Sequence, residues 1–270
     1  MSGLINRIKT YRLISALIFI FSGMYSSVST AETVMITGAN AGIGFEFATQ
    51  YAAKGWDVIA VHRRDTPPAS LLELQADYPK IMIEYMDITL LDSVRALGAK
   101  LRGQQIDVLL NNAGYGGDFS GPSQALGTLD YDSFETIMRT NGLGALAVTE
   151  AFVDNVRASD RGVVVAMSSN LGTFGAGPPY GGGYWYRMSK ASLHMVLLTL
   201  SKDLKQDGVI VAAINPGVVW SQKNLDHGLI PEDRMVKVDV AVGGLINVID
   251  EMTMEDSGRM VNYKGERGGW

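Results

Sequence analysis

A glycine-rich turn at residues 37–44, Thr-Gly-Ala-Asn-Ala-Gly-Ile-Gly, most constrains how this chain can fold. The turn follows a short apolar run at residues 33–36, typical of a buried strand, and opens into a helical pattern at residues 43–54. Glycines here let the backbone approach a pyrophosphate, and the helix N-terminus presents unpaired N–H groups to it. The turn therefore predicts a dinucleotide site, although a turn that binds nothing has the same local pattern.

Strand and helix patterns alternate along the rest of the chain. Strands are expected near residues 33–37, 57–62, 81–87, 106–111, 162–168, 209–215 and 258–262. Helices are expected near residues 43–54, 69–76, 91–102, 132–156, 185–207 and 239–252. This alternation predicts an α/β fold, a single-domain, Rossmann-like, doubly wound parallel sheet of about seven strands with helices on both faces. Ligands of such sheets bind beyond the carboxyl ends of the strands.

The composition excludes several classes of function. A length of 270 residues suits one such domain with a short additional segment. The formal net charge of −5 argues against broad nucleic-acid binding, which depends on a basic surface. The absence of cysteine excludes disulfides and thiolate catalysis, and His62, His194 and His227 have no metal-binding spacing, so we predict no metal site.

Residues 1–31 have the pattern of a secretory signal peptide. Three basic residues, Arg7, Lys9 and Arg12, precede an apolar run at 13–21, and small residues lead to Ala31. The run is shorter than the about 20 residues that a membrane span needs. We therefore expect cleavage after Ala31, a domain at 32–270, and a secreted or periplasmic protein. An uncleaved membrane anchor, or an unused segment on a cytoplasmic protein, would be alternatives.

Further motifs follow the glycine turn. They are Asn112-Ala113-Gly114, Asn141, Ser168-Ser169, Tyr186-x-x-x-Lys190 and Pro216-Gly217. In this order, and with the Gly-x-x-x-Gly-x-Gly spacing of the turn, they resemble the short-chain dehydrogenase/reductase family over about residues 32–270. Three further features resemble the carbonyl-reductase-like, C-factor-like branch of this family. They are the Ser-Gly-x-x-x-x-Tyr-x-Gly segment that begins at Ser257, the terminal Trp270, and Arg187 after the tyrosine.

The resemblance implies four catalytic residues, which are Asn141, Ser169, Tyr186 and Lys190. Tyr186 and Lys190 lie four residues apart, hence on one face of a helix, where an ammonium should lower the pKa of a phenol. In the family, this tyrosine donates a proton to the carbonyl oxygen, and the lysine holds the nicotinamide ribose. Ser169, with Ser168 as the alternative, would bind the substrate carbonyl, and Asn141 would hold a water in a proton relay.

The resemblance also implies a set of cofactor-binding residues. Besides Tyr186 and Lys190 they are Gly38, Asn40, Gly42, Ile43, Gly44, Arg63, Asp87, Ile88, Asn112, Ala113, Gly114, Pro216, Gly217, Val219 and Ser221. Family members that use NAD carry an aspartate at the position of His62, whereas Arg63 can bind the 2′-phosphate of NADP. We therefore expect NADP(H), with NAD(H) possible, although Arg63 could also be an ordinary surface residue. Asp87 would bind the adenine.

The predicted function is an NADP(H)-dependent oxidoreductase that interconverts a small uncharged aldehyde or ketone and its alcohol. The alternatives are a dinucleotide-binding signalling or interaction protein of C-factor type and an isomerase. Loops at residues 172–184 and 221–236 would frame the substrate pocket, with Tyr115, Phe174, Trp185 and Trp220 as apolar candidates. Family members often pair through the helices at 132–156 and 185–207, which favours a homodimer or homotetramer. An exported protein would fit this function poorly, because free dinucleotide cofactor is found in the cytosol.

Overall fold

The computed structural model describes residues 31–118, 121–175, 181–228 and 230–270. Its described residues contain one sheet of eight strands in the order β3-β2-β1-β4-β5-β6-β7-β8. Neighbouring strands are parallel from β3 to β7, and only β8 runs antiparallel, along β7. The strands are β1 (Thr33–Thr37), β2 (Asp57–His62), β3 (Ile81–Tyr85), β4 (Val108–Asn111), β5 (Val163–Met167), β6 (Ile210–Asn215), β7 (Met260–Asn262) and β8 (Arg267–Gly268).

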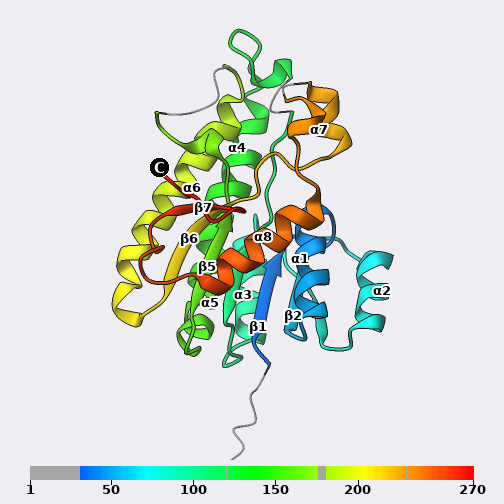
Figure 1. Cartoon of the computed structure of the whole chain (residues 1–270), viewed down its shortest axis with the longest axis vertical. Helices are drawn as coiled ribbons and strands as arrows, with labels where there is room; N and C mark the ends of the chain where they lie inside the picture. The colour runs from blue at the N-terminus through cyan, green and yellow to red at the C-terminus, as the bar shows by residue number, and fades with distance from the viewer. Residues whose placement is uncertain (1–30, 119–120, 176–180, 229) are drawn as a thin grey trace, which may run out of the picture. The chain divides into compact units, whose positions relative to one another are not determined.

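Helices cover both faces of this sheet (Figure 1). The α-helices are α1 (Gly42–Ala53), α2 (Ala69–Asp77), α3 (Leu91–Lys100), α4 (Asp132–Met138), α5 (Gly144–Arg157), α6 (Tyr184–Asp203), α7 (Gln222–His227) and α8 (Val238–Glu251). Short 3₁₀ turns lie at Pro122–Gln124, Asn170–Gly172, Lys205–Asp207 and Glu232–Arg234, and a π turn lies at Arg139–Leu143. Side chains of α1, α2 and α8 pack on one face, and side chains of α3, α5 and α6 pack on the other.

The strands are apolar throughout because both of their faces are buried. In β1, Val34 and Ile36 join the core cluster with α1 and α8, whereas Met35 points to the opposite cluster. The same alternation in β5 sends Val163 and Val164 to opposite faces. A strand with two buried faces has no polar side, which explains the continuous Val/Ile/Leu runs of the sequence.

The predicted doubly wound α/β fold is confirmed, with two differences in detail. About seven strands were expected, and the eighth is β8, a two-residue strand that turns back onto β7. The helix expected at 132–156 is divided by the π turn into α4 and α5. The chain stays helical through the π turn between α4 and α5, so the helical pattern of the sequence did not reveal the division.

The predicted signal peptide covers residues 1–31, and all of these except Ala31 lie outside the described residues. From Ala31 to Trp270 the chain forms one compact unit. Within the described part, no helix is both long enough and apolar enough to cross a membrane. Cleavage, anchoring and export therefore stay predictions.

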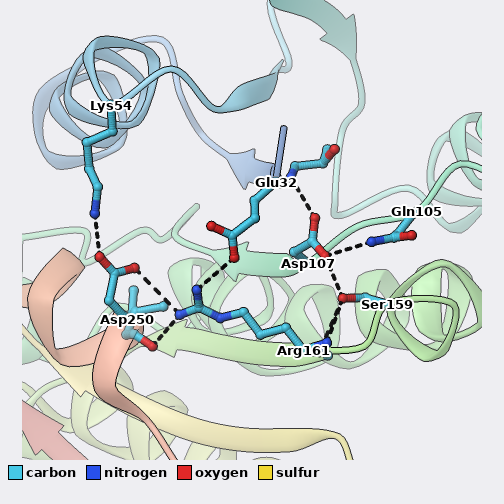
Figure 2. A network of polar contacts seen from close by, with 10 residues as sticks. Glu32, Lys54, Gln105, Asp107, Ser159, Arg161 and Asp250 are labelled. Atoms are coloured by element: carbon cyan, nitrogen blue, oxygen red, sulfur yellow. Dashed lines mark hydrogen bonds and ion pairs between the residues drawn. The ribbon is translucent and has the colours of Figure 1, made fainter. Parts of the chain in front are cut away.

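Asp107 joins three segments at the amino ends of the strands (Figure 2). Its Oδ2 accepts a hydrogen bond of 2.7 Å from the backbone N–H of Thr33, the first residue of β1. Its Oδ1 accepts bonds from Gln105 Nε2 at 2.9 Å and from Ser159 Oγ at 2.5 Å. The carboxylate thus fixes the start of β1 beside the segments that precede β4 and β5.

Arg161 extends this network to the last helix (Figure 2). The guanidinium pairs with Glu32 at 3.1 Å and Asp250 at 3.5 Å, and it donates to the carbonyl of Ile249 at 2.7 Å. Lys54, at the end of α1, forms an ion pair with the same Asp250. These contacts tie the beginning of the domain to α1 and α8 at the edge opposite the carboxyl ends of the strands, so we assign them a structural role.

Candidate active site

The glycine turn between β1 and α1 needs its three glycines for two different reasons. Gly38 and Gly42 have φ of +68° and +55°, in the left-handed region that other residues rarely adopt. Gly44 packs so closely that an added Cβ would lie 2.2 Å from the carbonyl oxygen of Gly38 and 2.4 Å from Nδ2 of Asn112. The close approach presses the start of α1 against the ends of β1 and β4, as a phosphate-binding turn requires.

The N-terminus of α1 has no cap of its own. Ala41 occupies the N-cap position, where it offers no polar side chain, and the first turn contains no acidic residue. The first N–H groups of a helix need partners, and they carry the positive end of the helix dipole. This helix end is therefore suited to an anionic group of a ligand.

A cavity of about 530 Å³ lies at the carboxyl ends of the strands, beside this turn. Among the residues that line it, those expected from the sequence are Gly38, Asn40, Ile43, Gly44, Arg63, Ile88, Asn112, Ala113 and Gly114. Tyr115, expected as an apolar residue of the substrate pocket, also lines the cavity, and the lining residues not predicted as ligand contacts are Ala41, His62, Arg64, Met86, Thr89 and Thr140. The volume is within the range of small-molecule sites, and the polar groups converge from several loops.

Thr37 and Asn112 fix the geometry of this cavity. Thr37 Oγ1 accepts hydrogen bonds of 3.0 Å from the backbone N–H groups of Asn112 and Ala113. In return, Asn112 Nδ2 donates to the carbonyls of Thr37 at 3.0 Å and Gly38 at 3.3 Å. The ends of β1 and β4 are therefore locked together by four hydrogen bonds. Sequence reasoning missed Thr37, because its role depends on a strand that follows much later in the chain.

Two arginines stand at the end of β2. Arg63 and Arg64 are exposed and line the cavity, and no acidic residue of the described segments forms an ion pair with either guanidinium. The preceding His62 is buried, and it accepts a bond of 3.2 Å at Nδ1 from the backbone of Arg64. Burial, helped by the charge of Arg64, lowers the pKa of His62. This corner of the cavity is therefore cationic, with arginines that are able to bind phosphate oxygens.

Asp87 and Ile88 follow β3. Ile88 lines the cavity, whereas the Asp87 carboxylate accepts hydrogen bonds from the Thr89 backbone at 2.9 Å and from the Thr89 hydroxyl at 2.7 Å. Asp87 thus shapes the turn after the strand. Its expected contact with adenine stays a prediction.

Tyr186 and Lys190 lie one turn apart on α6. The Nζ atom of Lys190 lies 5.7 Å from the centroid of the Tyr186 ring and donates a 2.8 Å hydrogen bond to the carbonyl of Met167. Burial lowers the pKa of Lys190 to about 8. Burial also raises the pKa of Tyr186 to about 12, although a hydrogen bond with Ser169 opposes the rise. This direction is the opposite of the one expected, because burial outweighs any effect of the ammonium.

The two adjacent serines have different partners. Ser169 Oγ shares the hydrogen bond with Tyr186 and accepts a second one of 3.2 Å from the backbone N–H of Leu171. Ser168 is buried, and its Oγ lies 2.5 Å from Nε2 of His194. The geometry therefore favours Ser169, our first choice, as the hydroxyl that faces the reacting group.

Asn141 lies in the π turn, and its side chain is fully engaged. Its Oδ1 accepts from the Tyr115 backbone N–H at 2.7 Å. Its Nδ2 donates to the carbonyl of Tyr115 and to the hydroxyl of Ser189, both at 2.8 Å. Both amide hydrogens are thus used to hold the loop after β4 against α6. Asn141 Oδ1 and Lys190 Nζ both border Gly114, where an added Cβ would lie 3.4 Å and 3.8 Å from them. The relay role stays a prediction.

The remaining cofactor candidates follow β6 and do not line the 530 Å³ cavity. Gly217, after Pro216, has φ +73°, and its N–H binds Oδ1 of Asn215 at 3.0 Å. Val219 forms a bridge with Val236. Ser221 Oγ caps α7 by accepting from the Asn224 backbone at 3.1 Å. The segment expected to be a loop thus contains α7, and its roles in cofactor binding stay predictions.

The comparisons with known proteins decide the family. Residues 32–227 match the family model described as short chain dehydrogenase. This chain belongs to the short-chain dehydrogenase/reductase family. The chain is 33% identical over 177 residues to C-signal of Myxococcus xanthus, covering 66% of this chain and 100% of that protein. It is 32% identical over 236 residues to 1-hydroxy-2-glutathionyl-2-methyl-3-butene dehydrogenase of a Rhodococcus species, covering 87% and 97% of the two chains.

A solved short-chain relative has the same fold. It is the NADPH-bound carbonyl reductase from chicken fatty liver, which matches with a TM-score of 0.79 at 25% identity and covers 89% of this chain and 99% of that one. The expected membership, including the likeness to carbonyl reductases and to C-signal, is confirmed.

Aromatic residues around the site of this short-chain dehydrogenase/reductase fall into two groups. Trp185 is buried, its ring packs on Tyr131, and its Nε1 donates to the carbonyl of Asp130 at 2.9 Å. Its role is therefore packing, not the substrate contact considered from the sequence. Phe174, by contrast, is 81% exposed, and Trp220 is 46% exposed. They are free to contact a ligand. Residues 176–180, which lie between Phe174 and α6, are outside the described residues.

Proposed function

We propose that this protein is an NADP(H)-dependent oxidoreductase that interconverts an uncharged aldehyde or ketone and its alcohol. The observation that carries the proposal is the hydrogen-bonded contact of Tyr186 with Ser169, one helical turn from the buried Lys190. A phenol and a hydroxyl that converge on one point are able to hold a carbonyl oxygen between them. Gly114 connects the two parts of the site, because it lines the cavity and a Cβ added to it would lie 3.8 Å from Lys190 Nζ. We therefore expect a dinucleotide in the cavity to reach the reacting groups at this glycine.

The residues present fit a dinucleotide with a 2′-phosphate. The uncapped start of α1 suits the pyrophosphate, and Arg63 and Arg64 suit the additional phosphate, since no described acidic residue neutralises them. His62 replaces the carboxylate that would favour a free ribose hydroxyl. The NADPH carried by the chicken relative points the same way. When bound, the cofactor supplies or accepts the hydride, and NAD(H) remains the weaker alternative.

Tyr186 is the proton donor in this proposal. Its pKa, raised by burial to about 12, keeps the phenol protonated at neutral pH, which suits donation to a carbonyl oxygen during reduction. Ser169 orients that oxygen, and Lys190 provides a buried cation behind the tyrosine. In the reverse reaction, the oxidation of the alcohol, the same tyrosine oxygen would accept the proton.

The direct test is steady-state turnover with a panel of aldehydes and ketones. Consumption of NADPH, followed by its absorbance, should depend on an uncharged carbonyl compound and should exceed the rate with NADH. Charged keto acids serve as controls for the substrate class, because the proposal assigns no charged side chain to the binding of the substrate. Absence of turnover with every carbonyl, in protein that binds NADPH, would reject the proposal.

The second candidate is a signalling or interaction protein that retains the fold. It is favoured by the likeness to C-signal, which this chain matches over that protein's entire length. A protein that only binds has no need for a tyrosine, serine and lysine in contact, so this candidate explains less of the site. It predicts dinucleotide binding without turnover.

We further propose that residues 1–31 export the protein and are removed after Ala31. The support is the basic, apolar and small-residue order of the segment. Mass spectrometry of the protein from its own cells, after fractionation, tests this. A chain that begins at Glu32 outside the cytoplasm is expected, and an intact chain in the cytosol would contradict it.

A further inference from the structure

Gln124 is a buried polar side chain that uses both ends of its amide. It lies in the 3₁₀ turn Pro122–Gln124, between β4 and α4, and is only 1% exposed. Its Nε2 donates to the carbonyl of Gly116 at 2.9 Å, and its Oε1 accepts from the backbone N–H of Tyr186 at 3.0 Å. A buried amide with both ends bound is held in one orientation, because either broken bond would leave a buried polar group unpaired.

The bond to Tyr186 supplies a cap that α6 lacks. The N-cap residue of this helix, Gly183, adopts a left-handed conformation and has no side chain to bind the first N–H groups. Gln124 serves instead, since its main-chain carbonyl accepts from Gly183 at 3.0 Å and its side chain accepts from Tyr186. The cap thus comes from a residue 62 positions earlier in the chain. Capping of this kind fixes where a helix begins.

The bond to Gly116 acts on the other side of the same tyrosine. Gly116 borders the Tyr186 ring, since a Cβ added to this glycine would lie 3.6 Å from Cδ2 of Tyr186. The oxygen of the Gln124 amide therefore holds the backbone of Tyr186. The nitrogen of the same amide holds the segment at Gly116, against which the Tyr186 ring packs. Movement at Gln124 would change both the start of α6 and the neighbour of the ring.

We propose that Gln124 is a positioning residue that sets the place of the Tyr186 hydroxyl relative to Ser169 and Lys190. The geometry of this proposal rests on the two hydrogen bonds of the Gln124 side chain. Its expected effect on turnover rests on the proposed function. A displacement of about 1 Å at a reacting group costs about a hundredfold in rate. Loss of both bonds should therefore reduce kcat more than it reduces cofactor affinity.

Gln124→Met tests this, because it keeps the length of the side chain and removes both bonds. We expect kcat to fall by about tenfold to a hundredfold while the Kd for NADPH stays within about twofold. Gln75→Met is the matched control. This variant, on α2, removes a 2.7 Å bond from Gln75 Nε2 to the carbonyl of Ile81 in β3, and it should leave kcat unchanged. Equal kcat in Gln124→Met and wild type, or a parallel fall of kcat and cofactor affinity, would overturn the proposal.

Hydrogen exchange gives a readout that needs no turnover. The amides at the start of α6, including that of Tyr186, should exchange faster in Gln124→Met than in wild type and Gln75→Met. Unchanged protection there would overturn the proposal. If the wild-type protein does not reduce carbonyl compounds, the proposed function is rejected, and the exchange result still decides the role of Gln124.

If Gln124→Met does not fold, Gln124→Glu is the deciding variant, since its side chain keeps only the acceptor. A reduced kcat or faster exchange at α6 supports the proposal, and wild-type values of both overturn it.

Discussion

Lys190 donates a 2.8 Å hydrogen bond from its buried Nζ to the main-chain carbonyl of Met167. This bond links α6 to the last residue of β5, and the next residues of the chain are Ser168 and Ser169. The strand end that carries the candidate serine is thus held by the candidate lysine. Burial at this place lowers the pKa of Lys190 and raises that of Tyr186, so both groups are pushed toward their neutral forms.

Removal of the Tyr186 hydroxyl should separate binding from chemistry. Tyr186→Phe keeps the ring and should bind NADPH as wild type does, while kcat falls by about a hundredfold to ten-thousandfold because the proton donor is lost. Fluorescence titration of the cofactor and initial rates measure the two quantities. Tyr184→Phe, on the same helix, is the control and should keep most of its activity. Undiminished turnover in Tyr186→Phe would contradict the assignment.

Arg63 should decide the preference between the two cofactors. Arg63→Ala should raise the Kd for NADPH by about tenfold and leave that for NADH nearly unchanged, because only the former has a 2′-phosphate for the guanidinium to bind. Arg95→Ala is the control, since that exposed side chain pairs with Asp92 on α3. Titration of each variant with both cofactors gives the comparison. Equal effects of Arg63→Ala on the affinities for NADPH and NADH would show that Arg63 does not bind the 2′-phosphate.

His194 should make the fold sensitive to mild acid. Burial, with a contribution from the Lys190 charge, lowers its pKa to about 4 from the ordinary value of 6.5. The unfolded chain therefore binds a proton that the folded chain does not bind between these values. The stability supplied by this group is complete above about pH 6.5 and is lost as the pH falls toward about 4.

The measurement is urea unfolding at several pH values in that interval. In wild type the free energy of unfolding should fall with pH more steeply than in His194→Asn, which has no proton to gain there. The difference in slope isolates the histidine from the carboxylates, which are common to both proteins. Identical slopes would contradict the account of His194 as a buried neutral imidazole bonded to Ser168.

The predicted pairing of subunits has a candidate surface. A groove of about 360 Å³ between α4, the π turn and α6 is lined by apolar residues that include Phe134, Met138 and Leu143. Leu143 is 40% exposed, and Leu143→Asp should convert an oligomer into smaller species, because a charge there would be buried in the interface. Sedimentation velocity measures the change. Leu72→Asp, at an exposed leucine on α2, should have no such effect. A wild type that is already monomeric would contradict the prediction.

The sequence was sufficient for the parts of the site that depend on local patterns. The glycine turn, the apolar strands with two buried faces, and the Tyr186 to Lys190 spacing each have a short-range signature, and the family order of motifs joined them. It was not sufficient for contacts between distant segments. Gln124 gave no signal because its amide acts on a helix far along the chain, and the Ser168 to His194 bond likewise joins a strand end to the middle of α6. The direction in which the pKa of Tyr186 is shifted was also predicted wrongly, because it depends on burial, which the sequence spacing does not show.

The most direct test of the central claim is hydride transfer itself. NADPH that carries deuterium in both positions at C4 of the nicotinamide would be incubated with the protein and a ketone, and the alcohol would be analysed by mass spectrometry. The account predicts that deuterium appears on the carbinol carbon of the product with wild type, and that Tyr186→Phe forms almost none. Deuterium that stays in the cofactor, in wild-type protein shown to bind it, would contradict the assignment of this protein as a carbonyl-reducing enzyme.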